Sequence, residues 1–219
     1  MPDQSDLLRY YGARAHEYEK VYDKPERQDD LRRLHEIVPA YLAGRRALDV
    51  ACGTGYWTRR IAQRALAITG CDQSPEVLAL ARERQPTANH VQFVIGNAFS
   101  LSDLSGEFDA AFVGFWWSHV PREDLSRFVR GLHERLLPRS RVFIVDNRYV
   151  AGSNWPITRT DSSGNTYQHR VLDNGVGHEV LKNFPAASEL QTALTGAGAR
   201  DVDIQELPYY WYAAYELAP

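Results

Sequence analysis

The stretch Leu48-Asp49-Val50-Ala51-Cys52-Gly53-Thr54-Gly55 ends an apolar segment that begins at Ala47, and a helical pattern follows it from Tyr56. Glycine allows a sharp backbone turn and lets a ligand approach without a β-carbon in the way. The stretch therefore predicts a strand, a glycine loop and a helix. Open parallel sheets bind ligands at such loops, beyond the carboxyl ends of their strands.

Segments of strand length alternate with helical patterns along the rest of the chain. Strands are expected at 67–71, 91–95, 110–115, 141–145, 200–206 and 209–217, and helices at 56–64, 74–84, 121–137 and 186–195. This alternation favours a mostly parallel sheet covered on both faces. We predict an α/β fold with a doubly wound, Rossmann-like, seven-stranded sheet that ends in an antiparallel C-terminal edge hairpin.

Two segments stand outside this alternation. Residues 1–43 predict two helices interrupted near Lys24-Pro25. Residues 147–185 lack a helical stripe, and Asp173-Asn174-Gly175 between two strand-like runs predicts a hairpin. We interpret 1–219 as a single domain with an N-terminal helical segment (1–43), a core (44–146), an inserted cap (147–185) and a C-terminal helix and hairpin (186–219).

Composition excludes several classes of protein. The 219 residues are 44% hydrophobic and 24% charged, which is typical of a globular chain. The net charge of −3 argues against a nucleic-acid partner. There is no apolar run of about 18 residues and no secretory pattern at the start, so we expect a cytoplasmic protein with no membrane partner. Cys52 and Cys71 alone predict neither a disulfide scaffold nor a metal site.

Polar residues around the glycine loop indicate the kind of ligand. Asp72 lies 17 residues after Gly55 at the end of the second strand, where a carboxylate accepts hydrogen bonds from ribose hydroxyls. A dinucleotide site has a third glycine where this chain has Thr58. Asp49 would repel a pyrophosphate but suits a cationic ligand. These two residues argue against a nicotinamide cofactor.

Asp49-x-Ala51-x-Gly53-x-Gly55, Asp72 and Asn97-Ala98 resemble, in their order and spacing, the class I S-adenosylmethionine-dependent methyltransferase family. The segments 108–115 and 136–138 are similar to the fourth strand of that family and the approach to its fifth. The resemblance covers about 46–146. It implies S-adenosylmethionine as cofactor, S-adenosylhomocysteine as product and no metal.

The resemblance also implies a role for each matching position. It assigns the methionine part to the backbone around Ala51, Gly53 and Gly55, the ribose to Asp72, the adenine to Gln73, Asn97 and Ala98, and the methionine end to Gly114 and Phe115, beside Asp49. The chain departs from the family pattern at three places: Ala51 replaces a glycine, Asn97 replaces the commoner aspartate, and Pro138-Arg139-Ser140 replaces a Pro-Gly-Gly turn. The alternatives are a plain turn at the glycines, a helix N-terminal carboxylate at Asp72 and a turn residue at Asn97.

Methyl transfer requires mainly that nucleophile, methyl group and sulfur be aligned, so no universal catalytic residue is expected. His119 follows the fourth strand and is the candidate base, because it titrates near neutrality. Its alternative is a hydrogen-bonded loop histidine. Trp117 is a candidate substrate contact beside it, provided that the strand continues.

The remaining candidates come from the N-terminal segment and the cap. Similar family members fold such N-terminal helices over the cofactor as a lid, which would bring Tyr11 and Tyr18 near it. The equal alternative is a helix that packs against the domain by its aromatic stripe. In the cap, Arg148, Trp155 and Arg170 are candidate substrate contacts. Residues 147–183 carry four basic and three acidic side chains, which favours a small anionic group on the substrate or, equally, a solvated hairpin face.

We therefore predict a methyltransferase that acts on a small molecule, as a monomer or homodimer. The aromatic residues around the expected pocket suggest an aromatic or heteroaromatic acceptor, with oxygen or nitrogen as the default acceptor atom and carbon as a further option. Two alternatives stay open. One is a protein of the same fold that binds S-adenosylmethionine or S-adenosylhomocysteine as a lyase, cyclase or sensor, and the other is a nicotinamide oxidoreductase.

Overall fold

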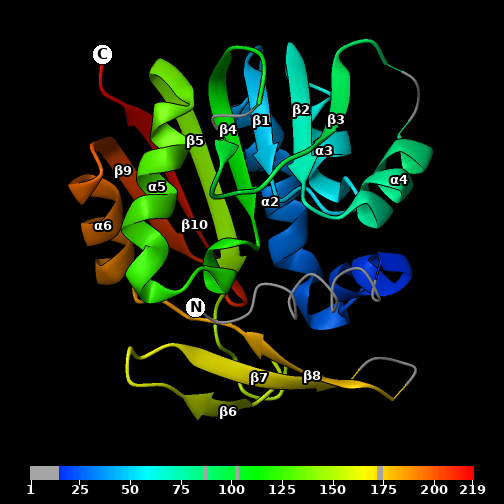
Figure 1. Cartoon of the computed structure of the whole chain (residues 1–219), viewed down its shortest axis with the longest axis vertical. Coiled ribbons are helices and arrows are strands. Elements are labelled where there is room, and N and C mark those ends of the chain that lie inside the picture. The colour runs from blue at the N-terminus through cyan, green and yellow to red at the C-terminus, as the bar shows by residue number, and fades with distance from the viewer. Residues whose placement is uncertain (1–14, 86–87, 102–103, 172–174) are drawn as a thin grey trace.

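The structure is a computed structural model that describes residues 15–85, 88–101, 104–171 and 175–219, without the side chains of 15–18. A seven-stranded sheet has the strand order β3-β2-β1-β4-β5-β10-β9 (Figure 1). Its strands are β1 (Arg46–Val50), β2 (Ala67–Asp72), β3 (Val91–Ile95), β4 (Phe108–Gly114), β5 (Leu136–Asn147), β9 (Ala199–Glu206) and β10 (Tyr210–Leu217). The first five are parallel, and β10 runs antiparallel to both β5 and β9. The predicted sheet and its edge hairpin are confirmed.

Successive side chains along each strand point to opposite faces of the sheet and so pack into two separate cores. On β4, Ala111 and Val113 join the core beneath α5 (Leu125–Glu134) and α6 (Ala187–Gly196). Their neighbour Phe112 joins the opposite core, beneath α2 (Gln28–Tyr41) and α3 (Tyr56–Ile61). Burial of a side chain as large as Val113 or Phe112 contributes about 1.5–3 kcal/mol. The two cores hold the parallel strands in fixed register.

Helix α2 is held against the C-terminal hairpin by polar contacts as well as by packing. The buried Asp30 carboxylate accepts a hydrogen bond from the Tyr209 backbone N–H at 2.7 Å. At the other end of the helix, the Tyr41 hydroxyl donates to the Tyr215 carbonyl oxygen at 2.9 Å. These contacts fix both ends of α2, and the one at Asp30 lies close to the three-ten helix η2 (Pro25–Arg27) that precedes it.

A second, three-stranded sheet forms the cap between β5 and α6. Its strands β6 (Ile157–Thr160), β7 (Thr166–Val171) and β8 (Gly177–Leu181) pair antiparallel. In Figure 1 this sheet lies across the end of the main sheet to which the parallel strands point. The sequence indicated β7 and β8 but not β6, because every side chain of β6 is exposed and shows no alternation. Asp173 and Asn174 lie outside the described residues.

Three predicted boundaries are corrected. The helix expected at 121–137 is shorter, since α5 begins at Leu125 and ends at Glu134. Strand β5 begins at Leu136 rather than 141, because Leu136 already pairs with Phe108 before a register shift in the ladder with β4. The helix expected at 56–64 ends at Ile61. Among the described helices, none has the length and apolar character needed to cross a bilayer.

A buried ion pair joins the cap to the main sheet. Lys182 follows β8, and its Nζ lies 3.0 Å from Oδ1 of Asp146 near the end of β5. The lysine side chain is 4% exposed and the aspartate is fully buried. The backbone N–H groups of Ser118 and Asn147 also donate to the Asp146 carboxylate, at 2.9 and 2.7 Å. Such a pair strongly disfavours separation of the two side chains, because each would then be a buried charge without a partner.

We predict that Asp146→Ala lowers the free energy of unfolding by about 3–5 kcal/mol, because Lys182 is left buried and uncompensated. Urea denaturation followed by circular dichroism measures this loss. The control is Glu179→Ala, which removes the partner of Arg159 in the exposed pair on the cap and should change stability little. Equal, small losses in the two variants would contradict a structural role for the buried pair.

Candidate active site

The loop after β1 is a compact turn with three left-handed residues. Ala51, Gly53 and Gly55 have φ angles of 55°, 55° and 74°. A β-carbon at Gly55 would lie 3.0 Å from the Phe93 ring and 3.3 Å from Cβ of Ala81, so this position requires glycine. Ala51 adopts the same conformation with a side chain, and strain of this kind is commonly stored at functional sites.

Asp72 is held firmly at the end of β2. Its Oδ2 accepts a hydrogen bond from the Gly53 backbone N–H at 2.9 Å, and its Oδ1 accepts one from Ser74 N–H at 3.0 Å. Burial raises the pKa of the Asp72 carboxyl, although these backbone donors oppose the shift. A carboxylate has about four acceptor positions, so Asp72 can still accept hydrogen bonds from a ligand. Gln73 beside it is exposed.

Asp49 lies beneath the same loop. Its side chain is 1% exposed, and the Thr58 hydroxyl donates to its Oδ2 at 2.6 Å. Burial raises the pKa of Asp49 to about 7; the Thr58 hydrogen bond opposes this rise and the nearby Asp72 adds to it. A positive charge placed close to Asp49 would favour its ionised form.

The loops after β3 and β4 supply the other predicted cofactor residues. Asn97 Oδ1 accepts a hydrogen bond from the Phe99 backbone N–H at 2.8 Å, which makes Asn97 a turn residue with its amide nitrogen still available. Ala98 packs against the core. A β-carbon at Gly114 would lie only 2.6 Å from the Phe112 ring. The next residue, Phe115, has a φ of 60°, which ends the strand.

The N-terminal segment is anchored over the glycine loop by Glu19. This residue belongs to the three-ten helix η1 (Ala15–Tyr22). Its carboxylate accepts from the Thr54 hydroxyl at 2.8 Å and pairs with Arg59 and Arg84 at 3.0 and 2.8 Å. No pattern in the sequence indicated this contact. Tyr11 and the Tyr18 side chain, which we expected near the cofactor, lie outside the described residues.

A cavity of about 280 Å³ opens between η1, η2, the end of β4 and the cap. Phe115, His119, Trp155 and Arg170 line it, as does Lys182. The first four of these were predicted as site residues from sequence. The structure therefore brings predicted residues from two distant parts of the chain, the segment after β4 and the cap, to one cavity.

Two predicted substrate contacts lie elsewhere. Trp117 is 1% exposed and packs in the core with its ring edge-on to Trp211 at 6.1 Å. The strand that would have turned Trp117 toward the pocket ends at the left-handed Phe115, and residues 117–119 form a three-ten turn instead. Arg148 points to the β9–β10 turn, where it donates to the Leu207 carbonyl and pairs with Glu206. Both expectations are corrected.

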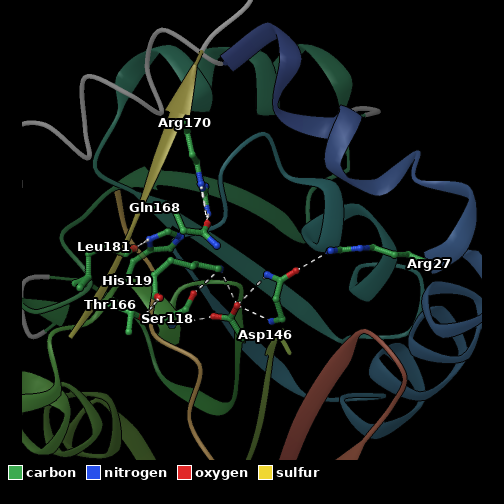
Figure 2. Close-up of polar contacts among 10 residues, drawn as sticks. Arg27, Ser118, His119, Asp146, Thr166, Gln168, Arg170 and Leu181 are labelled. Atoms are coloured by element: carbon green, nitrogen blue, oxygen red, sulfur yellow. Dashed lines mark hydrogen bonds and ion pairs between the residues drawn. The ribbon is translucent and has the colours of Figure 1, made fainter. Parts of the chain in front are cut away.

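His119 is buried and lines the cavity. Its Nδ1 lies 2.7 Å from the Leu181 carbonyl oxygen, and since a carbonyl only accepts, Nδ1 carries the proton (Figure 2). Burial, together with the charges of Lys182 and Arg170, holds the pKa of His119 well below its ordinary value. The imidazole is therefore neutral around pH 7.

Several polar residues of the site escaped sequence reasoning. A hydrogen-bonded chain runs from Arg27 through Asn147 and Asp146 to Lys182 and Ser118 (Figure 2). Asp146 gave one usable signal, since it follows the apolar strand at 141–145 and functional residues gather at such strand ends. Arg27 gave none, because it is one arginine among many on a polar helical segment.

Comparisons with known proteins agree with this geometry. A family model described as a methyltransferase domain matches residues 47–139. A ubiquinone biosynthesis O-methyltransferase from Pseudomonas aeruginosa strain LESB58 is 30% identical over 84% of this chain and 81% of its own length. The chain belongs to the class I S-adenosylmethionine-dependent methyltransferase family.

The chain is also similar to a second curated methyltransferase and to a solved structure that covers nearly its whole length. A demethylmenaquinone methyltransferase from Lactiplantibacillus plantarum is 25% identical over 77% of this chain and 76% of its own length. The solved structure of DhpI with SAH is 28% identical, with a TM-score of 0.78, and covers 98% of this chain and 97% of its own. A second DhpI structure is described as a complex with SAM and HEP.

The cofactor of the methyltransferase is S-adenosylmethionine, and the residues present fit it. Asp72 would accept the ribose hydroxyls, and the loop at 53–55, which carries no β-carbon at Gly53 and Gly55, would hold the methionine part. Asp49 offers a carboxyl that a cationic ligand would ionise. When bound, S-adenosylmethionine supplies a methyl group on a positively charged sulfur. The nicotinamide and non-transferase alternatives are thereby set aside.

We predict that the affinity for S-adenosylmethionine weakens about tenfold between pH 8 and pH 6. Below its pKa of about 7 the Asp49 carboxyl is protonated, and binding a cation then requires the loss of that proton, at about 1.4 kcal/mol per pH unit. Calorimetric titration at several pH values measures this dependence. Asp49→Asn should bind more weakly at pH 8 and lose the dependence, whereas Asp203→Asn on the exposed face of β9 should retain it. A dependence that survives in Asp49→Asn would contradict the assignment.

Proposed function

We propose that this methyltransferase transfers the methyl group of S-adenosylmethionine to an oxygen of a small molecule bound in the 280 Å³ cavity. The observation that carries the proposal is the position of this cavity. Phe115 follows the carboxyl end of β4, beside the loop after β1, and its ring also lines the cavity wall. An acceptor there would lie close to the cofactor loop, which is the arrangement that alignment of the reacting atoms requires.

The size and lining of the cavity support a small acceptor. Ligand pockets generally begin at about 300 Å³, so this volume suits a compact molecule. The rings of Tyr22, Phe115 and Trp155 line it, which supports the aromatic or heteroaromatic acceptor expected from sequence. The oxygen acceptor is supported by the names of the ubiquinone biosynthesis O-methyltransferase relatives.

In this proposal the chain acts by binding and orienting the acceptor, and His119 forms part of the wall. An efficient general base has a pKa near the working pH. The pKa of His119 lies well below that range, because the ring is buried beside cationic groups. The hypothesis from sequence, in which His119 takes a proton from the acceptor, is therefore the second candidate.

The two candidates differ in what His119→Asn does. Asparagine keeps a side-chain N–H near the position of Nδ1, for the Leu181 carbonyl, and removes Nε2. We expect kcat to fall less than tenfold, because a wall residue contributes no proton transfer. The activity assay follows formation of S-adenosylhomocysteine with the best acceptor from a small-molecule screen.

The matched control is His133→Asn. His133 also binds a backbone carbonyl through Nδ1, that of Ala197 at 3.0 Å, but it lies on α5 away from the cavity. A fall of 100-fold or more in kcat for His119→Asn alone, with cofactor affinity unchanged, would contradict the proposal. General-base catalysis contributes about 10²–10⁴-fold, so that result would identify His119 as the base.

A further inference from the structure

The cavity that we propose as the acceptor site is lined by positive charge. Among its lining residues that the structure describes, five are cationic and none is acidic. The cationic residues are Lys20, Lys24, Arg27, Arg170 and Lys182. The whole chain carries a net charge of −3, so this concentration of cations does not reflect its composition.

Lys182 has its charge balanced within the protein. The Asp146 carboxylate lies 3.0 Å from its ammonium group, and both side chains are buried. Ser118 Oγ accepts a further hydrogen bond from the same Nζ. The pair is close to neutral as seen from the cavity, so Lys182 adds little to the positive charge of the lining.

Arg27 is buried with only neutral hydrogen-bond acceptors among the described residues. Its side chain is 2% exposed. Nη1 donates to Asn147 Oδ1 at 2.8 Å, and Nε and Nη2 donate to Ser153 Oγ at 3.0 and 2.9 Å. Glu26 binds the same serine hydroxyl from the exposed side. A buried charge that is hydrogen-bonded but not ion-paired is costly to desolvate, and an anion nearby would offset that cost.

Arg170 enters the same cavity from the cap. Its side chain is 8% exposed, and Nε and Nη2 both donate to Gln168 Oε1, at 3.2 and 2.8 Å. In Figure 2, Arg27 and Arg170 reach in from different sides, one from η2 and the other from β7. Two guanidinium groups on separate walls suit a planar or tetrahedral oxyanion, because each can donate a charge-assisted hydrogen bond to it.

We propose that the acceptor carries an oxyanion, a carboxylate or a phosphate-type group, and that Arg27 and Arg170 recognise it. This inference rests on the proposed function, because it assumes that the acceptor occupies this cavity. It agrees with the aromatic side of the lining, since a ring that bears an acidic group satisfies both. Recognition by Arg27 also joins the N-terminal segment to the cap through the ligand, so the two walls hold the acceptor together.

Binding to the protein saturated with S-adenosylhomocysteine tests the proposal by calorimetry. The probes are benzoate and methylphosphonate, with benzamide as the neutral isostere of benzoate. We expect benzoate to bind at least tenfold more tightly than benzamide. Arg27→Gln and Arg170→Gln should each reduce that preference at least fivefold, while the affinity for S-adenosylhomocysteine stays within twofold.

Arg159→Gln is the matched control, because Arg159 lies on the exposed face of the cap and pairs with Glu179 there. It should retain the full preference. Arg27→Lys, which keeps the charge, should bind benzoate better than Arg27→Gln. If the glutamine variant fails to fold, the lysine variant is compared with the unmodified protein in its place.

The results distinguish failure of this inference from failure of the proposed function on which it rests. Two results would contradict an oxyanion on the acceptor and leave the proposed function standing. One is benzoate that binds no more tightly than benzamide, and the other is an equal loss of the benzoate preference in Arg159→Gln. If Phe115→Ala, which alters the cavity wall, leaves the binding of all three probes unchanged, the acceptor does not occupy this cavity. That result would overturn the proposed function together with the inference.

Discussion

The parallel register of β1 with its two neighbours is the constraint on which the site depends. Val50 pairs with Cys71 of β2 on one side and with Val113 of β4 on the other. The three strands therefore end level, and the loops that follow them begin at one edge of the sheet. The two buried cores fix this register, since a slip of one residue would turn Phe112 and Val113 toward the wrong cores.

Charge divides this edge into two regions with different tasks. Two carboxyl groups adjoin the loop after β1, Asp49 on β1 and Asp72 at the end of β2, and burial raises the pKa of each. The cavity beyond Phe115 contains cations instead. S-adenosylmethionine brings a positive sulfur, and an oxyanion acceptor brings negative charge. In our proposal each ligand therefore meets the opposite charge on its own side, which also discourages either ligand from binding in the place of the other.

The part of the site that is local in sequence could be predicted, and the part that is assembled from distant segments could not. The glycine loop and Asp72 have a fixed spacing, because one strand, one helix and the next strand set it. Lys182 and Asp146 are 36 residues apart, and Arg27 and Asn147 are 120 apart, so no short spacing signals either contact. Trp117 shows the limit of periodicity, since the strand ends at a single left-handed residue, Phe115, and Trp117 is then buried in the core.

A crystal structure of the protein with S-adenosylhomocysteine would test the central claim most directly, namely that the loop after β1 holds the cofactor and the adjoining cavity holds the acceptor. We predict that the ribose hydroxyls contact the Asp72 carboxylate and that the sulfur faces the cavity at Phe115. A sulfur directed away from the cavity would contradict the account, as would S-adenosylhomocysteine bound between Arg27 and Arg170.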